Sequence, residues 1–186
     1  MHLSKVNQAL VTQLNEQENI MTNAVITETT IPVQHVKITF GRSFESVRAA
    51  FEAAILKLDS EILPLLGRGE VGSAKQKLES GPEISIFQHR DHGSVLQVAG
   101  LSRKAIQYDV GNPLTASKMT RHQLSAGQYA PFRVVFYENE QGHAVFEYDK
   151  PSSLFGQFGD ERVTAVARSL DAAVERAIAK LNHSAV

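Results

Sequence analysis

The triplet Gly111-Asn112-Pro113 follows an apolar stretch and precedes a helical pattern, a position where a chain can bind an anion. Asparagine is favoured at a helix N-cap and proline at the first helical residue, so the triplet predicts a strand-to-helix junction. The amides of Leu114 and Thr115 then lie at the helix N-terminus, where amides bind phosphate or carboxylate groups. A capping Asn112 side chain occupies the same amides, so the two interpretations compete, and the residue types favour the cap.

Three further residues, His122, Arg133 and Tyr148, are candidates for binding a ligand. Histidine titrates near neutral pH and arginine stays charged, so His122 and Arg133 can supply positive charge to an anion. We hypothesise a groove between the Gly-Asn-Pro helix start and a hairpin at 130–150. The glycine and asparagine of the triplet would shape this groove, and Tyr148 would provide an apolar wall with a hydroxyl group.

An enzyme is the hypothesis from another class, with His122 as the acid–base group and Asp149 as the carboxylate that orients it. This hypothesis needs the two side chains within hydrogen-bond reach of each other. The simplest interpretation is instead a surface His122 beside an Arg133 that pairs with Glu138 or Glu147. We therefore assign no catalytic residue.

The segment His89-Arg90-Asp91-His92 has two histidines at a spacing that can serve a metal ion, with Asp91 as a third ligand. In a turn these side chains point to different sides, and no second His/Asp cluster supports the site, so we expect no metal. The chain also has no Gly-rich phosphate loop, dinucleotide fingerprint or nucleophile elbow. We therefore expect no bound cofactor.

Hydrophobic patterns predict the elements that would position these residues. Alternation over 35–41 predicts a strand, and apolar residues at every third or fourth position after Ser43 predict a helix that this serine caps. The helix should end before Pro64. The Gly- and charge-rich stretch 67–83 predicts a mobile surface connection with no more than a helical turn at 73–78.

Three strands and a hairpin are expected next. Residues 84–100 predict two strands joined by an Arg-Asp-His-Gly turn, in which Gly93 supplies a positive φ, and 104–112 predict a third strand. A short helix follows Asn112. The stretch 130–151 is the strongest hairpin pattern in the chain, with its turn at Glu140-Gln141-Gly142.

The C-terminal part predicts a loop over 152–159 and a long helix that opens at Asp160. The helix carries an apolar stripe that must cover one face of the sheet: Val163, Val166, Leu170, Val174, Ile178 and Leu181. The order is a strand, a helix, several mostly antiparallel strands and a helix, which predicts an α+β two-layer sandwich with helices packed on one face of the sheet.

The second face of the sheet should stay open to solvent, a partner or a ligand. Alternation sends Phe136 and Tyr137 to opposite faces, so we expect Tyr137, together with Tyr148, on the open face. An outward apolar face often marks a partner, and two-fold symmetric pairs are the commonest assemblies, so we expect a homodimer.

Composition narrows the class of protein. The 186 residues include 19 basic and 20 acidic residues, so a net charge of -1 gives no global field that attracts nucleic acid or an anionic membrane. No apolar run reaches the length of a membrane span, and the first residues lack the apolar core of a signal peptide. The absence of cysteine fits a reducing compartment. We expect a cytoplasmic protein that binds neither nucleic acid nor membrane.

Residues 1–30 differ from the rest of the chain. Their apolar residues Leu3, Val6, Leu10 and Leu14 have helical spacing, and the polar stretch that follows has no period. We predict a loosely ordered N-terminal extension over 1–30, with a short helix, and a single α+β domain over 31–186. A third hypothesis is an interaction module that acts through this extension.

The chain resembles the family catalogued as domain of unknown function 302. The features that carry the resemblance are Gly111-Asn112-Pro113, Ala130 to Val134, Tyr137-Glu138, Gly142, Tyr148-Asp149 and Pro151-Ser152-Ser153. Element order agrees from about Val36 to Leu181, and the motifs lie within 106–160. The resemblance implies a fold similar to the β-α-β4-α arrangement of the TATA-binding protein, which agrees with the element order above. It also implies a small bacterial or archaeal protein from a family with no settled activity. Likeness of fold does not imply DNA binding.

The first function hypothesis is therefore a small soluble homodimeric binding or accessory protein. Its ligand would be a small anionic or amphipathic molecule held near the Gly-Asn-Pro triplet and the 130–150 hairpin.

Overall fold

The computed structural model describes residues 24–183. The chain divides into two units after Ile31; within the first, residues 24–31 have no helix or strand, and the helix predicted from Leu3 to Leu14 lies outside the described residues. The second unit has this order of elements: β1 (His35–Thr39), α2 (Phe44–Ala54), α3 (Ile62–Gly67), α4 (Val71–Ser80), β2 (Ser85–Asp91), α5 (His92–Leu96), η1 (Gln97–Ala99), β3 (Ala105–Gly111), α6 (Pro113–Thr120), η2 (Leu124–Tyr129), β4 (Phe132–Glu138), β5 (Ala144–Asp149), α7 (Pro151–Gly156) and α8 (Glu161–His183).

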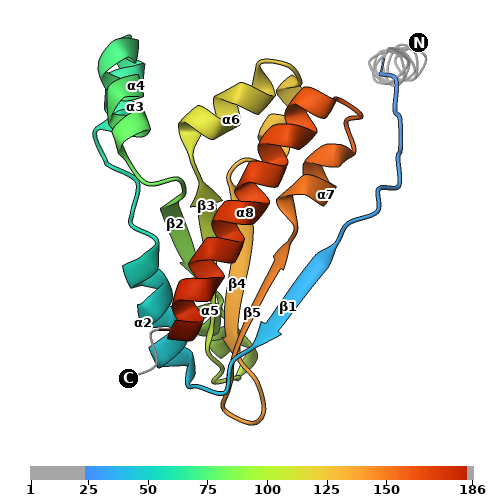
Figure 1. The fold of residues 1–186 in the computed structure, drawn as a ribbon. Coiled ribbons are helices and arrows are strands. Elements are labelled where there is room, and N and C mark those ends of the chain that lie inside the picture. Colours follow the sequence, from blue (N-terminus) through green and yellow to red (C-terminus); the bar gives the residue numbers. More distant parts are fainter. Residues whose placement is uncertain (1–23, 184–186) are drawn as a thin grey trace, which may run out of the picture. The chain divides into compact units, whose positions relative to one another are not determined.

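The five strands form one sheet in the order β1-β5-β4-β3-β2, and every neighbouring pair is antiparallel. The helices α2 and α8 pack together, and α8 crosses one face of the sheet (Figure 1). The α+β class, the β-α-β4-α order and the antiparallel sheet predicted from the sequence are confirmed. None of the described helices has both the length and the apolar character needed to cross a membrane.

The core lies between this sheet face and the two helices. The ring of Phe136 is 4.8 Å from that of Phe51 on α2 and 4.7 Å from that of Phe146 on β5. The predicted stripe of α8 faces inward: Val163 and Leu181 are fully buried, and Leu170 is 5% exposed. Burial of this stripe follows directly from its spacing, because residues three and four apart lie on one side of a helix.

The expectation of a mobile surface connection over 67–83 is wrong for residues 71–80, which form α4. Its buried side chains, Ala74 and Leu78, are four residues apart and so share one face of the helix. An ion pair between Lys77 Nζ and Asp59, at 2.6 Å, joins this helix to the segment before α3. Tertiary packing thus overrides the low helix propensity of a Gly-rich stretch.

The prediction of a second strand after Gly93 is also wrong, because α5 begins at His92. Asp91 caps this helix: its Oδ1 accepts a hydrogen bond from the Ser94 amide at 3.0 Å. Gly93 has no positive φ. It meets a different requirement, since a Cβ at this position would lie 2.5 Å from the carbonyl oxygen of Arg103.

The loop expected over 152–159 contains a helix, α7, with Pro151 at its first position. The Ser152 amide donates to Asp171 Oδ1 on α8 at 2.9 Å, and Phe155 is 1% exposed. Two of the apolar residues of this stretch, Leu154 and Phe155, therefore lie in a helix, and Phe158 follows it as a partly buried residue. The helix is too short to show a period, so the sequence pattern resembled a loop.

Tyr148 does not accompany Tyr137 on the open face, and that prediction is wrong. In the sheet register Tyr148 lies opposite Val36 and Val134, which face the helices, and it is 6% exposed. Tyr137 lies on the other face, where its hydroxyl meets Glu147. Successive residues of a strand face opposite sides of the sheet, so a shift of one position moves a side chain to the other face. The paired strands place the two tyrosines on opposite faces.

Candidate functional site

Asn112 caps α6, as the sequence predicts. Its Oδ1 accepts hydrogen bonds from the amides of Leu114 at 2.8 Å and Thr115 at 3.3 Å. Its Nδ2 donates to the carbonyl oxygen of Pro82 at 3.1 Å, which ties α6 to the connection between α4 and β2. Because the cap occupies both amides, these donors are not free to bind an anion.

A cavity of about 300 Å³ lies beside this helix start, and we name it the α6 cavity. Two segments remote in sequence meet in its wall: a Cβ on Gly111 would lie 3.5 Å from Cβ of Pro131, and both residues line the cavity. Most of the other lining side chains are apolar, among them Phe87, Met119, Tyr129, Phe132, Phe155 and Leu170. The cavity thus suits the apolar part of a small molecule.

The five residues predicted to bind a ligand do not meet in one place. Gly111 and Asn112 line the α6 cavity, whereas His122, Arg133 and Tyr148 are not among its lining residues. His122 is exposed and lies close enough to Asp160 to help lower the pKa of that carboxyl. Their roles in binding remain predictions, but the five residues do not line one common groove.

The pair proposed for acid–base chemistry is likewise apart. Asp149 Oδ1 is hydrogen-bonded to His35 Nδ1 at 2.9 Å. Within residues 24–183 no hydrogen bond joins His122 to Asp149.

The residues of the His89–His92 segment take separate structural positions. The His89 ring lies 5.9 Å from that of Tyr108, Arg90 pairs with Asp109, and Asp91 caps α5. Across the part of the chain that the structure describes, no group of three or more His, Cys, Asp or Glu residues is arranged to hold a metal ion.

Arg133 belongs to a polar grid on the open face of the sheet. It lies opposite Asp109 across the β3–β4 pair. The hydrogen bonds to Asp109 come from β2: Arg90 donates to it at 2.8 and 3.0 Å and Gln88 at 2.7 Å. Burial raises the pKa of Asp109, but these hydrogen bonds outweigh it and hold the pKa below the usual 3.8. Asp109 is therefore an ionised, nearly buried anchor between two neighbouring strands.

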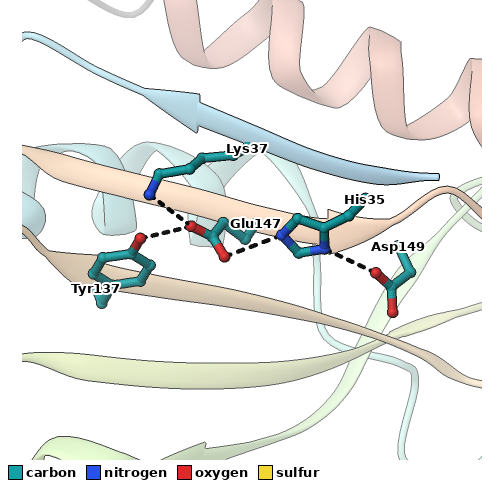
Figure 2. Close-up of polar contacts among 5 residues, drawn as sticks. All are labelled: His35, Lys37, Tyr137, Glu147 and Asp149. Atoms are coloured by element: carbon teal, nitrogen blue, oxygen red, sulfur yellow. Dashed lines mark hydrogen bonds and ion pairs between the residues drawn. The ribbon is translucent and has the colours of Figure 1, made fainter. Parts of the chain in front are cut away.

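A second polar cluster occupies the β1 side of the same face, and Figure 2 shows its five residues. Glu147 accepts hydrogen bonds from the Tyr137 hydroxyl at 2.6 Å and Lys37 Nζ at 3.2 Å. His35 bridges the two carboxylates of β5, with Nε2 3.1 Å from Glu147 and Nδ1 2.9 Å from Asp149. The cluster ties the edge strand β1 to β5 and β4 through side chains.

The charges of this cluster support one another. The hydrogen bonds to Asp149 and then to Glu147 raise the pKa of His35 above its usual 6.5. Burial raises the pKa of Glu147, but hydrogen bonds from Tyr137, Lys37 and His35 outweigh it, so the pKa lies below 4.5. When His35 is protonated, both of its ring nitrogens donate to carboxylates.

This arrangement predicts a pH-dependent contribution of His35 to stability. Because its pKa is raised in the folded state, the contribution is complete below 6.5 and is lost as the pH rises through the raised value. His35→Gln should therefore lower the free energy of unfolding more at about pH 5.5 than at about pH 8.5, by less than about 1 kcal/mol for so exposed a pair. Urea denaturation of both proteins at the two pH values measures this difference. An equal loss at both values would contradict it.

Sequence reasoning missed this cluster and most of the cavity wall. The local signal was present, because His35 and Lys37, and likewise Glu147 and Asp149, are two apart and share a face of their strand. What was lacking is the pairing of β1 with β5. Phe155 and Tyr129 were missed because they lie in a stretch predicted as a loop and in the connection after α6.

Comparison with known proteins agrees with the fold. The sequence pattern described as "Domain of unknown function DUF302" matches residues 71–181. A crystal structure of an uncharacterized conserved DUF302 protein from Bacillus stearothermophilus is similar, with a TM-score of 0.58 and 17% identity over 79% of this chain and 97% of that chain. A search of curated proteins gave no match. Since the family pattern spans more than half of the sequence and includes the α6 cap and the central hairpin, the chain belongs to the DUF302 family.

Proposed function

We propose that the protein binds a small apolar or amphipathic molecule in the α6 cavity. The observation that carries the proposal is the convergence of Gly111-Asn112 and Ala130-Pro131-Phe132 on one cavity of about 300 Å³. This volume is at the lower end of the range for small-molecule sites, which are mostly apolar with a few polar groups.

The polar side chains of the wall are few. Asn112 at the cap of α6 and Thr115, Ser117 and Thr120 within it line the cavity, and apart from the Tyr129 hydroxyl the other lining side chains are aromatic or aliphatic. A ligand with an apolar body and one polar end fits this division better than a fully ionic one, because an ion in an apolar site loses its hydration. This favours the amphipathic half of the ligand class expected from the sequence.

Filling the cavity tests the proposal. In the variant Ala116→Phe, a large side chain replaces the methyl group of a residue that lines the cavity, so binding of 1-octanol should fall at least about tenfold. Changes in amide chemical shifts during titration measure the affinity and show where the alcohol binds. The shifts should be largest in β3, α6 and the start of β4.

Ala53→Phe is the matched control, because Ala53 is exposed on α2 and lines none of the cavity. It should leave the affinity unchanged. Ala116→Leu gives a smaller filling if the larger variant does not fold. Wild-type protein that shows no saturable shifts with 1-octanol, or shifts unaffected by either filling, would overturn the proposal.

The proposal also includes a homodimer in the cytoplasm. Two-fold pairs are the commonest assemblies, and a chain without cysteine suits a reducing compartment. The open face does not itself support a dimer, since its polar clusters carry charged residues and only Tyr137 of the expected tyrosine pair lies there. Sedimentation velocity tests the dimer directly, because the chain alone has a mass of 20.4 kDa.

A further inference from the structure

A second hollow, of about 790 Å³, lies between α4, α6 and α8, and we name it the basic groove. Four cationic residues line it: Lys75, Lys118, Arg121 and Arg176. Only two acidic residues, Glu79 and Glu83, do so. The groove therefore carries an excess of positive charge in a protein whose overall charge is -1.

The carboxylates of the groove neutralise two of its cations. Arg176 is bidentate to Glu83, with Nη2 donating to Oε1 at 2.9 Å and Nε to Oε2 at 3.2 Å, and Lys75 pairs with Glu79 at 3.5 Å. Within residues 24–183, by contrast, no carboxylate lies in ion-pair range of Lys118 or Arg121. Lys118 in the last turn of α6 and Arg121 at its C-cap are the uncompensated charges of the groove.

The basic groove adjoins the α6 cavity. Four residues line both hollows: Asn112, Thr115, Ser117 and Leu170. One side of α6 thus borders an apolar space, while Lys118 and Arg121 border a charged one that is open to solvent. An anion in this groove keeps part of its hydration, so its attraction to the two cations is not offset by a large desolvation cost.

We propose that the ligand is an amphipathic anion: its alkyl chain fills the α6 cavity, and its carboxylate or phosphate head group binds Lys118 and Arg121 in the basic groove. This inference rests on the proposed function and adds the charge and the position of the head group. Arginine binds a carboxylate or phosphate with two parallel hydrogen bonds, and lysine adds a mobile point charge.

Isothermal titration with three probes of equal chain length tests the inference: octanoate, octyl phosphate and 1-octanol. The wild-type protein should bind both anions at least about tenfold more tightly than the alcohol. Added salt should lower the affinity for the two anions and leave the affinity for 1-octanol unchanged. The double variant Lys118→Gln/Arg121→Gln should lose this preference while its affinity for 1-octanol stays the same.

Lys57→Gln/Arg103→Gln is the matched control, since it also removes two exposed positive charges and neither residue lines the cavity or the groove. It should keep the preference for anions. Inorganic phosphate, as a fourth probe, should bind far more weakly than octyl phosphate. Equal binding of these two would overturn the inference, because the groove would then be a site for a free anion.

Other outcomes separate this inference from the proposed function. If 1-octanol binds as tightly as octanoate, and the double variant changes neither, the head-group assignment is wrong and the cavity remains a binding site. If none of the three alkyl probes binds, both the inference and the proposed function are overturned.

Discussion

Phe136→Ala is expected to lower the free energy of unfolding by about 3–5 kcal/mol, the usual cost of removing a buried aromatic ring from a core. Phe136 is fully buried in the middle strand of the sheet. Its ring touches three others, with centroid distances of 4.8 Å to Phe51, 6.0 Å to Tyr108 and 4.7 Å to Phe146. The cavity left by the ring therefore has aromatic walls that cannot collapse without moving both layers.

Chemical denaturation with urea measures this loss, and an unchanged slope shows that the unfolded state is the same. Phe158→Ala is a suitable control, because Phe158 is only partly buried at the edge of the core. Its cost should be at most about half as large. A loss of less than about 1 kcal/mol for Phe136→Ala would mean that the core relaxes around the missing ring.

Gly93→Ala should lower the free energy of unfolding by about 1–3 kcal/mol, the range for forcing an extra carbon into a packed site. The added Cβ would lie 2.5 Å from the Arg103 carbonyl oxygen and 3.1 Å from the Ala105 amide nitrogen. Both atoms belong to the backbone, so neither can rotate away as the end of a side chain could. The start of α5 and the start of β3 must separate to accept the methyl group.

Gly72→Ala provides the opposite expectation, since nothing lies within 4 Å of a Cβ there and the residue is inside α4. It should raise stability by about 0.5–1 kcal/mol.

Gly93→Asn distinguishes the two roles considered for Gly93. A left-handed turn would tolerate asparagine better than alanine, whereas a close backbone approach makes asparagine at least as costly. Thermal denaturation of the three variants gives the order.

The sequence predicted the parts of the fold that have a local cause. Strand alternation in 35–39, the Ser43 and Asn112 caps and the long stripe of α8 are all set by neighbouring residues. The helices that it missed, α3, α4, α5 and α7, are short or rich in glycine, and α4 and α7 are held by contacts with distant residues. Asp171 on α8 holds α7, and Asp59 holds α4, in both cases across a distance in sequence that no periodicity reports.

The candidate site shows the same limit more sharply. The cap at Asn112 was readable because it concerns residues 112–115. The cluster on the open face was not, because His35 and Glu147 are 112 positions apart and meet only when β1 lies beside β5. The prediction for Tyr148 failed for a different reason: Tyr148 was grouped with Tyr137 as the outward aromatic pair, and only the register with Val36 and Val134 shows that its side chain faces the helices.

The construction of the α6 cavity wall has a consequence for how ligands can be discovered. The wall of the α6 cavity is built from segments around Leu63, Phe87, Gly111, Pro131 and Phe155, which are joined only by the fold. A molecule that contacts all of these segments binds only the folded protein. At a free concentration one hundred times its dissociation constant, such a ligand would raise the free energy of unfolding by about 2.7 kcal/mol. The melting temperature of the protein would thus rise with its own ligand, so a library of metabolites can be sorted by heat alone.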